Sequence, residues 1–223
     1  MKIKELTLYT NHLDEQYDFY IKKIGLEMIH KSPERFELQV GTSILTFIKS
    51  NHCTPYHFAI NIPSNKEIEA LNWLKKKVTI LKDNDDEIID FTAWNAKAMY
   101  FYDYDKNIVE FIARKNLNSC SEEVFGSESL LEISEIGVAT TSVIEKFDFL
   151  TKQISLSKYS GDLDRFCAIG SENGLFICID KSKKDWYPNS DKAFSSEFDI
   201  AIEVEGKPLI LEYKNDRFTL LNS

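Results

Sequence analysis

The chain has 223 residues, of which 43% are apolar and 28% charged, and its formal net charge is −9. This length suits one large domain or two of about 110 residues, and the acidic charge disfavours binding to nucleic acid or to an anionic membrane. We see neither a signal-peptide pattern nor the ~18 apolar residues of a membrane span. The cysteines are scattered without metal-binding spacing, so we expect reduced thiols and a cytoplasmic protein.

The first 48 residues predict a strand, a helix and three further strands. Residues 4–10 alternate between apolar and polar side chains, which is typical of a half-buried strand. An apolar stripe at helical spacing follows, and Gly25 is well placed to end that helix. The stripe consists of Leu13, Tyr17, Tyr20 and Ile24, and the three strands cover residues 27–29, 35–40 and 43–48. This order is one βαβββ module.

The same order recurs further along the chain. Residues 56–62 alternate as a strand, and Ser64 with Glu67 predicts a capping box at the start of a helix. Three strands are expected after this helix, at residues 78–81, 99–102 and 108–112. Residues 1–115 therefore predict two modules in one domain.

A polar, serine-rich stretch at residues 116–130 predicts a linker to a second domain, residues 131–223. A third module follows it, with a capping box at Ser142 and Glu145. Its strands are expected at residues 133–139, 165–169 and 175–179, and its helix is marked by Ile144, Phe147, Leu150 and Ile154. Glu5 and Phe19 recur as Glu135 and Phe149, both at an offset of 130, so we infer an internal duplication.

The fourth module is shorter than the other three. Strands are expected at residues 198–204, 209–213 and 217–221, and no helical pattern fits between the first two. Either this module has lost its helix, or another segment around Trp186 replaces it.

Two stretches resemble a known superfamily. Residues 5–20, ending in Phe19-Tyr20 before Ile24-Gly25-Leu26, are similar to the opening strand and helix of the glyoxalase/bleomycin-resistance/extradiol-dioxygenase (vicinal oxygen chelate) proteins. Residues 100–111 resemble their closing hairpin, in which Asp-Pro-Asp-Gly-Asn precedes a metal-binding Glu. Tyr104 and Lys106 here replace the proline and the glycine, while Glu110 is kept. The resemblance implies an α+β fold in which paired βαβββ modules form curved mixed sheets around a cleft, duplicated as two domains with the fourth module truncated.

The resemblance also implies four ligand positions, which are Glu5, Thr46, His57 and Glu110. Strand alternation independently places each of them on the face opposite its apolar neighbours. We expect Glu5, His57 and Glu110 to bind one divalent ion such as Mn²⁺, Fe²⁺, Ni²⁺ or Zn²⁺. Without a cofactor, His57 would instead be hydrogen-bonded to Glu110. The equivalent positions of the second half are Glu135, Ile177, Asp199 and roughly Leu220, where we expect no metal.

The remaining candidates are substrate-binding residues, namely Thr46, Tyr9, Tyr100 and Tyr102, with Trp94 at the mouth of the cleft. Two functions stay open. One is a metal-dependent lyase, isomerase or dioxygenase-like enzyme acting on a small oxygenated molecule. The other is a metal-free protein that binds or sequesters an organic ligand, as bleomycin-resistance proteins do. The four ligands of glyoxalase I and the two histidines of extradiol dioxygenases are both incomplete here. The expected partner is a small molecule, and a homodimer is an open alternative.

Overall fold

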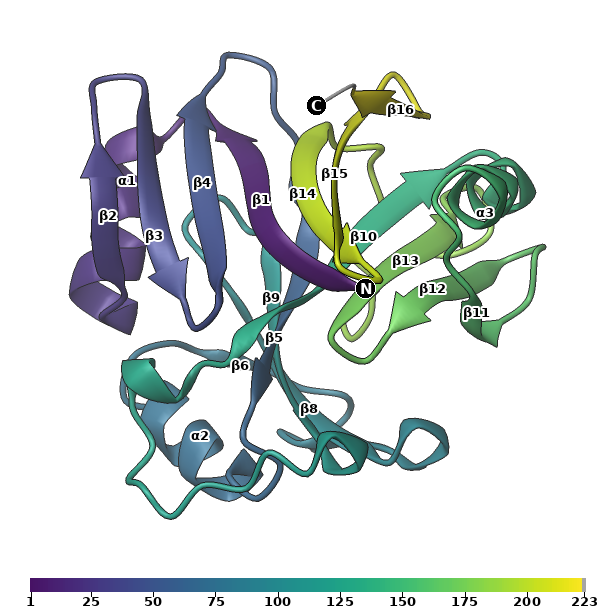
Figure 1. Cartoon of the computed structure of the whole chain (residues 1–223). Coiled ribbons are helices and arrows are strands. Elements are labelled where there is room, and N and C mark those ends of the chain that lie inside the picture. Colours follow the sequence, from purple (N-terminus) through teal and green to yellow (C-terminus); the bar gives the residue numbers. More distant parts are fainter. Residues whose placement is uncertain (222–223) are drawn as a thin grey trace.

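The computed structural model describes residues 1–221 and contains four strand-rich modules (Figure 1). Module 1 comprises β1 (Lys2–Thr10), α1 (Leu13–Asp18), η1 (Phe19–Ile24), β2 (Glu27–Lys31), β3 (Arg35–Val40) and β4 (Ser43–Lys49). Module 2 comprises β5 (His57–Ile62), α2 (Glu67–Leu74), β6 (Ile80–Leu81), β7 (Ile89–Phe91), η2 (Thr92–Trp94), β8 (Ala96–Tyr102) and β9 (Ile108–Arg114). The predicted α+β class and its βαβββ modules are confirmed.

The second half of the chain follows two short turns, η3 (Lys115–Leu117) and η4 (Ser127–Ser129). Module 3 comprises β10 (Glu132–Thr140), α3 (Val143–Lys152), β11 (Lys158–Gly161), β12 (Phe166–Ser171) and β13 (Gly174–Asp180). Module 4 comprises only β14 (Phe198–Val204), β15 (Lys207–Lys214) and β16 (Arg217–Leu221). None of the helices in residues 1–221 is long and apolar enough to cross a membrane.

Each of the two sheets combines one module from each half of the chain. Modules 1 and 4 form a seven-stranded sheet in the order β16-β15-β14-β1-β4-β3-β2. Modules 2 and 3 form a nine-stranded sheet in the order β11-β12-β13-β10-β5-β9-β8-β6, with β7 beside β8. The two seams between halves are the antiparallel pairs β1–β14 and β5–β10. The predicted domains, residues 1–115 and 131–223, therefore do not coincide with the two sheets. Side-chain alternation indicates which face of a strand is buried, but it does not indicate which strand lies beside it.

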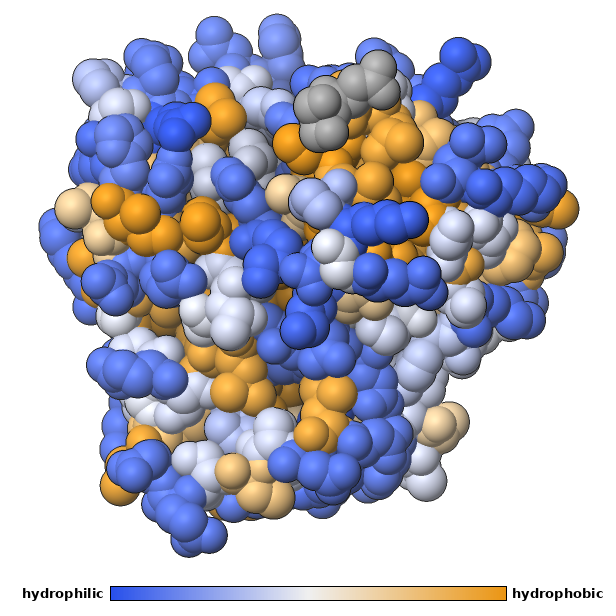
Figure 2. Space-filling model, viewed as in Figure 1, coloured by the Kyte–Doolittle hydropathy of each residue, from blue (hydrophilic) through white to orange (hydrophobic). Residues whose placement is uncertain are grey.

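One hydrophobic core joins both sheets and the helices. Leu6 and Phe47 enter it from the seven-stranded sheet, and Phe58 and Phe111 enter it from the nine-stranded sheet. A second, smaller apolar cluster, including Ala59 and Ile177, covers the opposite face of the nine-stranded sheet. In the view of Figure 2 the surface is mostly hydrophilic, with apolar side chains gathered near β14–β16, where Ile210 and Leu220 are exposed.

Helix α3 serves two modules, which explains how the shortened module is covered. Residues 198–221 form three strands without a helix, and Phe218 on β16 stacks on Phe149 of α3 with ring centroids 5.7 Å apart. The segment around Trp186 does not replace the missing helix, because it precedes β14 and packs beside the nine-stranded sheet.

The two expected capping boxes behave differently. Ser142 caps α3 by accepting a hydrogen bond from the backbone N–H of Glu145 at 3.4 Å. The box at Ser64 was wrong, because α2 begins only at Glu67 and the Ser64 hydroxyl lies 3.3 Å from the Cys120 sulfur. Residues 116–130 pack against the fold through buried Phe125, so a polar sequence here does not give a free linker.

Candidate metal centre and ligand cavity

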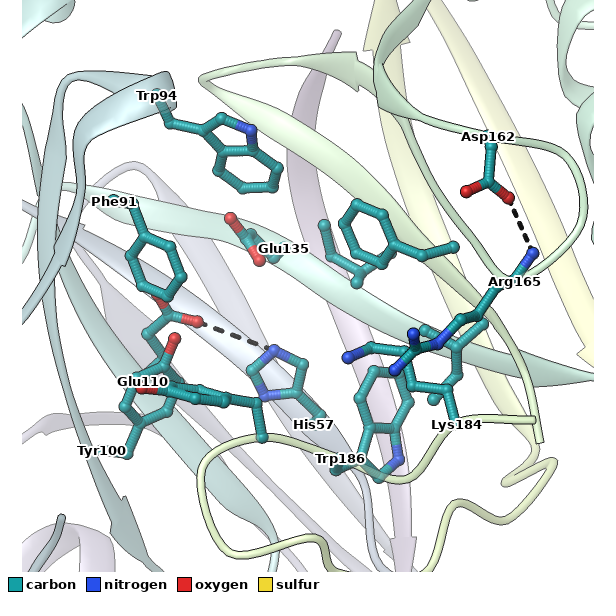
Figure 3. A pocket seen from close by; sticks show the side chains of 14 residues that line it. His57, Phe91, Trp94, Tyr100, Glu110, Glu135, Asp162, Arg165, Lys184 and Trp186 are labelled. Carbon is teal, nitrogen blue, oxygen red and sulfur yellow. Dashed lines mark hydrogen bonds and ion pairs between the residues drawn. The ribbon is translucent and has the colours of Figure 1, made fainter. Parts of the chain in front are cut away.

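A cavity of about 480 Å³ lies over the face of the nine-stranded sheet that points away from the main core. Modules 2 and 3 form its walls together with the segment that contains Trp186. Its aromatic lining consists of Phe91, Trp94, Tyr100, Phe166, Trp186 and Tyr187 (Figure 3). Such a volume and lining are typical of sites that hold small organic molecules.

Three buried polar side chains converge at this cavity, namely His57 on β5, Glu110 on β9 and Glu135 on β10. Their candidate ligand atoms all lie within 4.8 Å of one another. Strand register explains the convergence, because Ala59 is paired with Glu110 on one side and with Glu135 on the other. His57 lies two residues before Ala59 and so projects from the same face of the sheet.

One hydrogen bond of His57 shows which of its ring nitrogens is free to bind a metal ion. Its Nδ1 lies 3.2 Å from the carbonyl oxygen of Ile108, to which it donates, so Nε2 carries the lone pair. Burial lowers the pKa of His57 to about 4, and the hydrogen bond to Ile108 only partly opposes this shift. The ring is therefore neutral near pH 7. Nε2 lies 3.6 Å from Oε2 of Glu110, which is too long for a hydrogen bond.

A buried arginine sits beside the two carboxylates. Arg114 is fully buried, forms an ion pair with Glu135 and donates from Nε to the Asn61 side-chain oxygen at 3.2 Å. Burial and the charge of Glu135 raise the pKa of Glu110 well above its usual value, against the opposing effect of Arg114. Burial also raises the pKa of Glu135, which Arg114 opposes. With both carboxylates ionised the cluster carries one net negative charge, so it calls for a proton or a cation.

The donor set fits a divalent metal ion. One neutral imidazole nitrogen and two carboxylates are suitable ligands for Mn²⁺, Fe²⁺ or Zn²⁺. Metal–ligand bonds of about 2.0–2.2 Å hold ligand atoms within roughly 4.4 Å of each other, so the 4.8 Å cluster needs only a small contraction. Ile177 also lines the cavity and is the second-half counterpart of Thr46, the fourth expected ligand position. Its side chain offers no donor atom.

The expected ligands Glu5, His57 and Glu110 are not brought together. Glu5 lies on β1 in the seven-stranded sheet, where it accepts a hydrogen bond from the Thr46 hydroxyl at 3.1 Å. Glu135, the duplicate of Glu5, lies beside His57 instead. The reason is that β5 pairs with β10, not with a strand of module 1.

The expected substrate-binding residues are also divided between the sheets. Tyr100 lines the cavity beside Glu110, and burial together with the charge of Glu110 raises the pKa of Tyr100 well above its usual value. Tyr102 lies in a neighbouring cavity of about 300 Å³ and donates to Asp191. Tyr9 lies on β1 of the seven-stranded sheet, which is paired with β4, the strand of Thr46, and it donates to Asp199 at 2.6 Å. Leu220, the expected counterpart of Glu110 in the second half, lies on the outer strand β16. Asp199 is paired with Glu212 of β15.

Several charged residues at the site were not predicted. Arg165 and Lys184, which line the cavity from loops, and Arg114, which pairs with Glu135, belong to no local motif. Glu135 had a usable signal, since the offset of 130 made it the duplicate of Glu5.

No protein-family model matches the sequence, and no curated protein is similar to it in sequence. Solved structures do match. A "putative dioxygenase" from Bacillus subtilis subsp. subtilis str. 168 aligns with 80% of this chain at a TM-score of 0.59 and 16% identity. The alignment covers 63% of that protein, so this chain spans less than two thirds of its length.

Two shorter proteins align with half of the chain. A glyoxalase/bleomycin resistance protein/dioxygenase from Alicyclobacillus acidocaldarius matches 51% of this chain and 91% of its own, at 22% identity and a TM-score of 0.43. The fosfomycin resistance protein FosX from Listeria monocytogenes, solved with Mn(II), matches 51% and 90%, at 18% identity and a TM-score of 0.40. Since the longer alignment, the three βαβββ-type modules and the shortened fourth module agree with the sequence resemblance, the chain has the fold of the vicinal oxygen chelate superfamily.

Proposed function

We propose that His57, Glu110 and Glu135 hold one divalent metal ion and that the adjacent cavity binds a small oxygenated organic molecule next to it. The observation that carries this proposal is the neutral Nε2 of His57, whose lone pair faces the Glu110 carboxylate with Glu135 completing the group. Two facing acceptors repel each other unless a cation or a proton lies between them. When bound, such an ion acts as a Lewis acid on a carbonyl or enolate oxygen, in lyase, isomerase or dioxygenase-like chemistry.

The surrounding residues have definable roles in this proposal. The Ile108 carbonyl fixes the His57 tautomer, and outer partners of this kind orient metal ligands. Arg114 forms an ion pair with Glu135 and opposes the rise in the pKa of that carboxyl, which favours its ionised form. The aromatic side chains give the cavity a largely apolar wall beside this polar cluster.

A second candidate is a metal-free binding protein of the bleomycin-resistance kind. Two observations favour it, the ion pair of Glu135 with Arg114 and the apolar Ile177 at the fourth position. Glu110 would then keep its proton, as its raised pKa allows, and would donate it to Nε2 of His57 once their 3.6 Å separation shortens to hydrogen-bond length.

Elemental analysis of protein purified without a His-tag separates the two candidates. We expect about one metal ion per chain in the wild type, and its loss in His57→Ala and Glu135→Gln. Glu5→Gln is the matched control, because Glu5 occupies the same position in the other sheet. Retention of the metal in Glu135→Gln together with its loss in Glu5→Gln would reject the proposed ligand set. No metal after incubation with Mn²⁺, Fe²⁺, Ni²⁺ and Zn²⁺ would favour the metal-free candidate.

A further inference from the structure

Two cationic side chains line the cavity without an acidic partner. Arg165, just before β12, and Lys184, in the segment between β13 and β14, both border it. Within residues 1–221, no carboxylate oxygen lies within 4.0 Å of the Arg165 guanidinium or the Lys184 ammonium group. Asp162 also lines the cavity, but its carboxylate accepts hydrogen bonds from the backbone N–H groups of Asp164 and Arg165, both at 2.8 Å. These bonds are the main cause that lowers its pKa, and the charge of Arg165 adds to them.

A comparison of two consecutive lysines shows that this arrangement is unusual. The exposed Lys183 forms ion pairs with Asp164 and with Asp180, the latter at 3.5 Å, and these partners raise its pKa. Lys184 is half-buried, and both its burial and the neighbouring charge of Arg165 lower its pKa. Arg165 itself is exposed, so the cost of the two like charges falls mainly on the half-buried Lys184, and a bound anion would offset that cost.

The acidic and basic side chains start from opposite sides of the cavity. In Figure 3, Glu110 lies on one side of His57, and Arg165 and Lys184 start from the other side and reach toward the middle of the cavity. Aromatic rings such as Trp94 and Phe166, whose centroids are 6.4 Å apart, line the space around them. A ligand that satisfies this arrangement has a flat apolar body and an anionic group at one end.

We propose that the ligand class of this cavity is a planar aromatic acid, with its anionic group bound by Arg165 and Lys184 and its body against the aromatic walls. The inference rests on the proposed function in one respect only, which is that the opposite end of the ligand would lie at His57, Glu110 and Glu135. Anion recognition by Arg165 and Lys184 requires no metal. Its failure is therefore distinguishable from failure of the metal proposal.

Two fluorescent probes with matching ring systems test this inference. 8-Anilinonaphthalene-1-sulfonate carries one anionic group, and N-phenyl-1-naphthylamine has the same rings without it. Titration of the full chain with each probe gives two dissociation constants for the wild type, Arg165→Gln and Lys184→Gln. Lys183→Gln is the control, because it removes the same charge at an adjacent position that is paired outside the cavity.

We expect Arg165→Gln and Lys184→Gln each to weaken binding of the sulfonate probe about fivefold, as loss of a partly exposed ion pair does. Binding of the neutral probe should stay within about twofold of the wild type, and Lys183→Gln should affect neither probe. Equal losses for both probes, no loss for the sulfonate, or no binding of either probe would overturn the inference. Repeating the titration in the His57→Ala background separates failure of this inference from failure of the metal proposal. Even if His57→Ala loses a metal, Arg165→Gln and Lys184→Gln should still weaken binding of the sulfonate probe.

Discussion

Arg114 is the charged side chain on which the buried cluster depends most. It is fully buried, pairs with Glu135 and leaves Nη1 without a hydrogen-bond partner within residues 1–221. Removing one member of a buried ion pair leaves its partner uncompensated, which costs about 3–5 kcal/mol. We therefore expect Arg114→Met to lower the free energy of unfolding by that amount in urea denaturation.

Arg35→Met is the control for this loss, since Arg35 pairs with Glu37 at the surface and should change stability by less than about 1 kcal/mol. If Arg114→Met were as stable as the wild type, Glu135 would have to be neutralised in the native state by something other than Arg114.

Asp103 gives stability a defined dependence on pH. Its carboxylate is buried and accepts hydrogen bonds from Gln16, Tyr20 and Asn107, yet burial outweighs them and raises its pKa from 3.8 to about 6. The folded state thus binds this proton more tightly than the unfolded state. The stabilisation from Asp103 is complete below about pH 4 and is lost as pH rises through 6, a change of about 3 kcal/mol.

Comparison with Asp103→Asn isolates this effect, because the variant cannot titrate at that position. Unfolding free energies measured in urea from pH 4 to pH 7 should fall more steeply for the wild type than for the variant. Parallel pH profiles would contradict the prediction. A constant offset between the two curves would report only the altered hydrogen bonds.

At the residue scale, side-chain alternation was informative but incomplete. It placed His57 and Glu110 on the face opposite Phe58 and Phe111, and the structure shows those faces. It could not show that Glu135 would lie beside them, since that depends on β5 pairing with β10. Alternation describes one strand, whereas a site of three strands depends on contacts distant in sequence.

At the scale of elements, the segment around Trp186 closes one side of the cavity by packing onto a glycine. A Cβ on Gly137 of β10 would lie 2.7 Å from the Trp186 ring, and that ring lies 5.1 Å from His57 between centroids. We expect Gly137→Ala to displace Trp186 and to lower the unfolding free energy by about 1–3 kcal/mol, as overpacking does. Tryptophan fluorescence should change with it.

A double-mutant cycle with Trp186→Phe checks the proposed contact. The smaller ring should make Gly137→Ala less costly, so the two changes should be non-additive. Strict additivity would mean that the Trp186 ring does not limit the space at Gly137.

Strong local patterns predicted the elements well. Residues 198–204 and 217–221 were predicted as strands with the bounds that the structure shows. The short strands β7 and β11 were missed, because three or four residues are too few for a period to emerge. The Ser64 box failed because the chain turns once more before α2, and no local pattern marks that turn.

At the scale of the whole molecule, the two halves hold each other together. Residues 1–115 alone would expose the edges of β1 and β5 that normally pair with β14 and β10. Exposed edges promote association. We expect residues 1–115 expressed alone to self-associate or aggregate, and to form a soluble complex when co-expressed with residues 116–223. Size-exclusion chromatography with circular dichroism measures both, and a folded monomer of residues 1–115 would count against this prediction.

The seam between β5 and β10 runs beneath the candidate site, with His57 on one side of it and Glu135 on the other. A bound ligand or ion that contacts both residues would therefore stabilise the β5–β10 pairing, through which the two halves are joined in the nine-stranded sheet. Amide hydrogens along this seam should exchange more slowly as ligand is added. The β1–β14 seam of the other sheet provides an internal reference within the same sample, since the cluster does not extend to it.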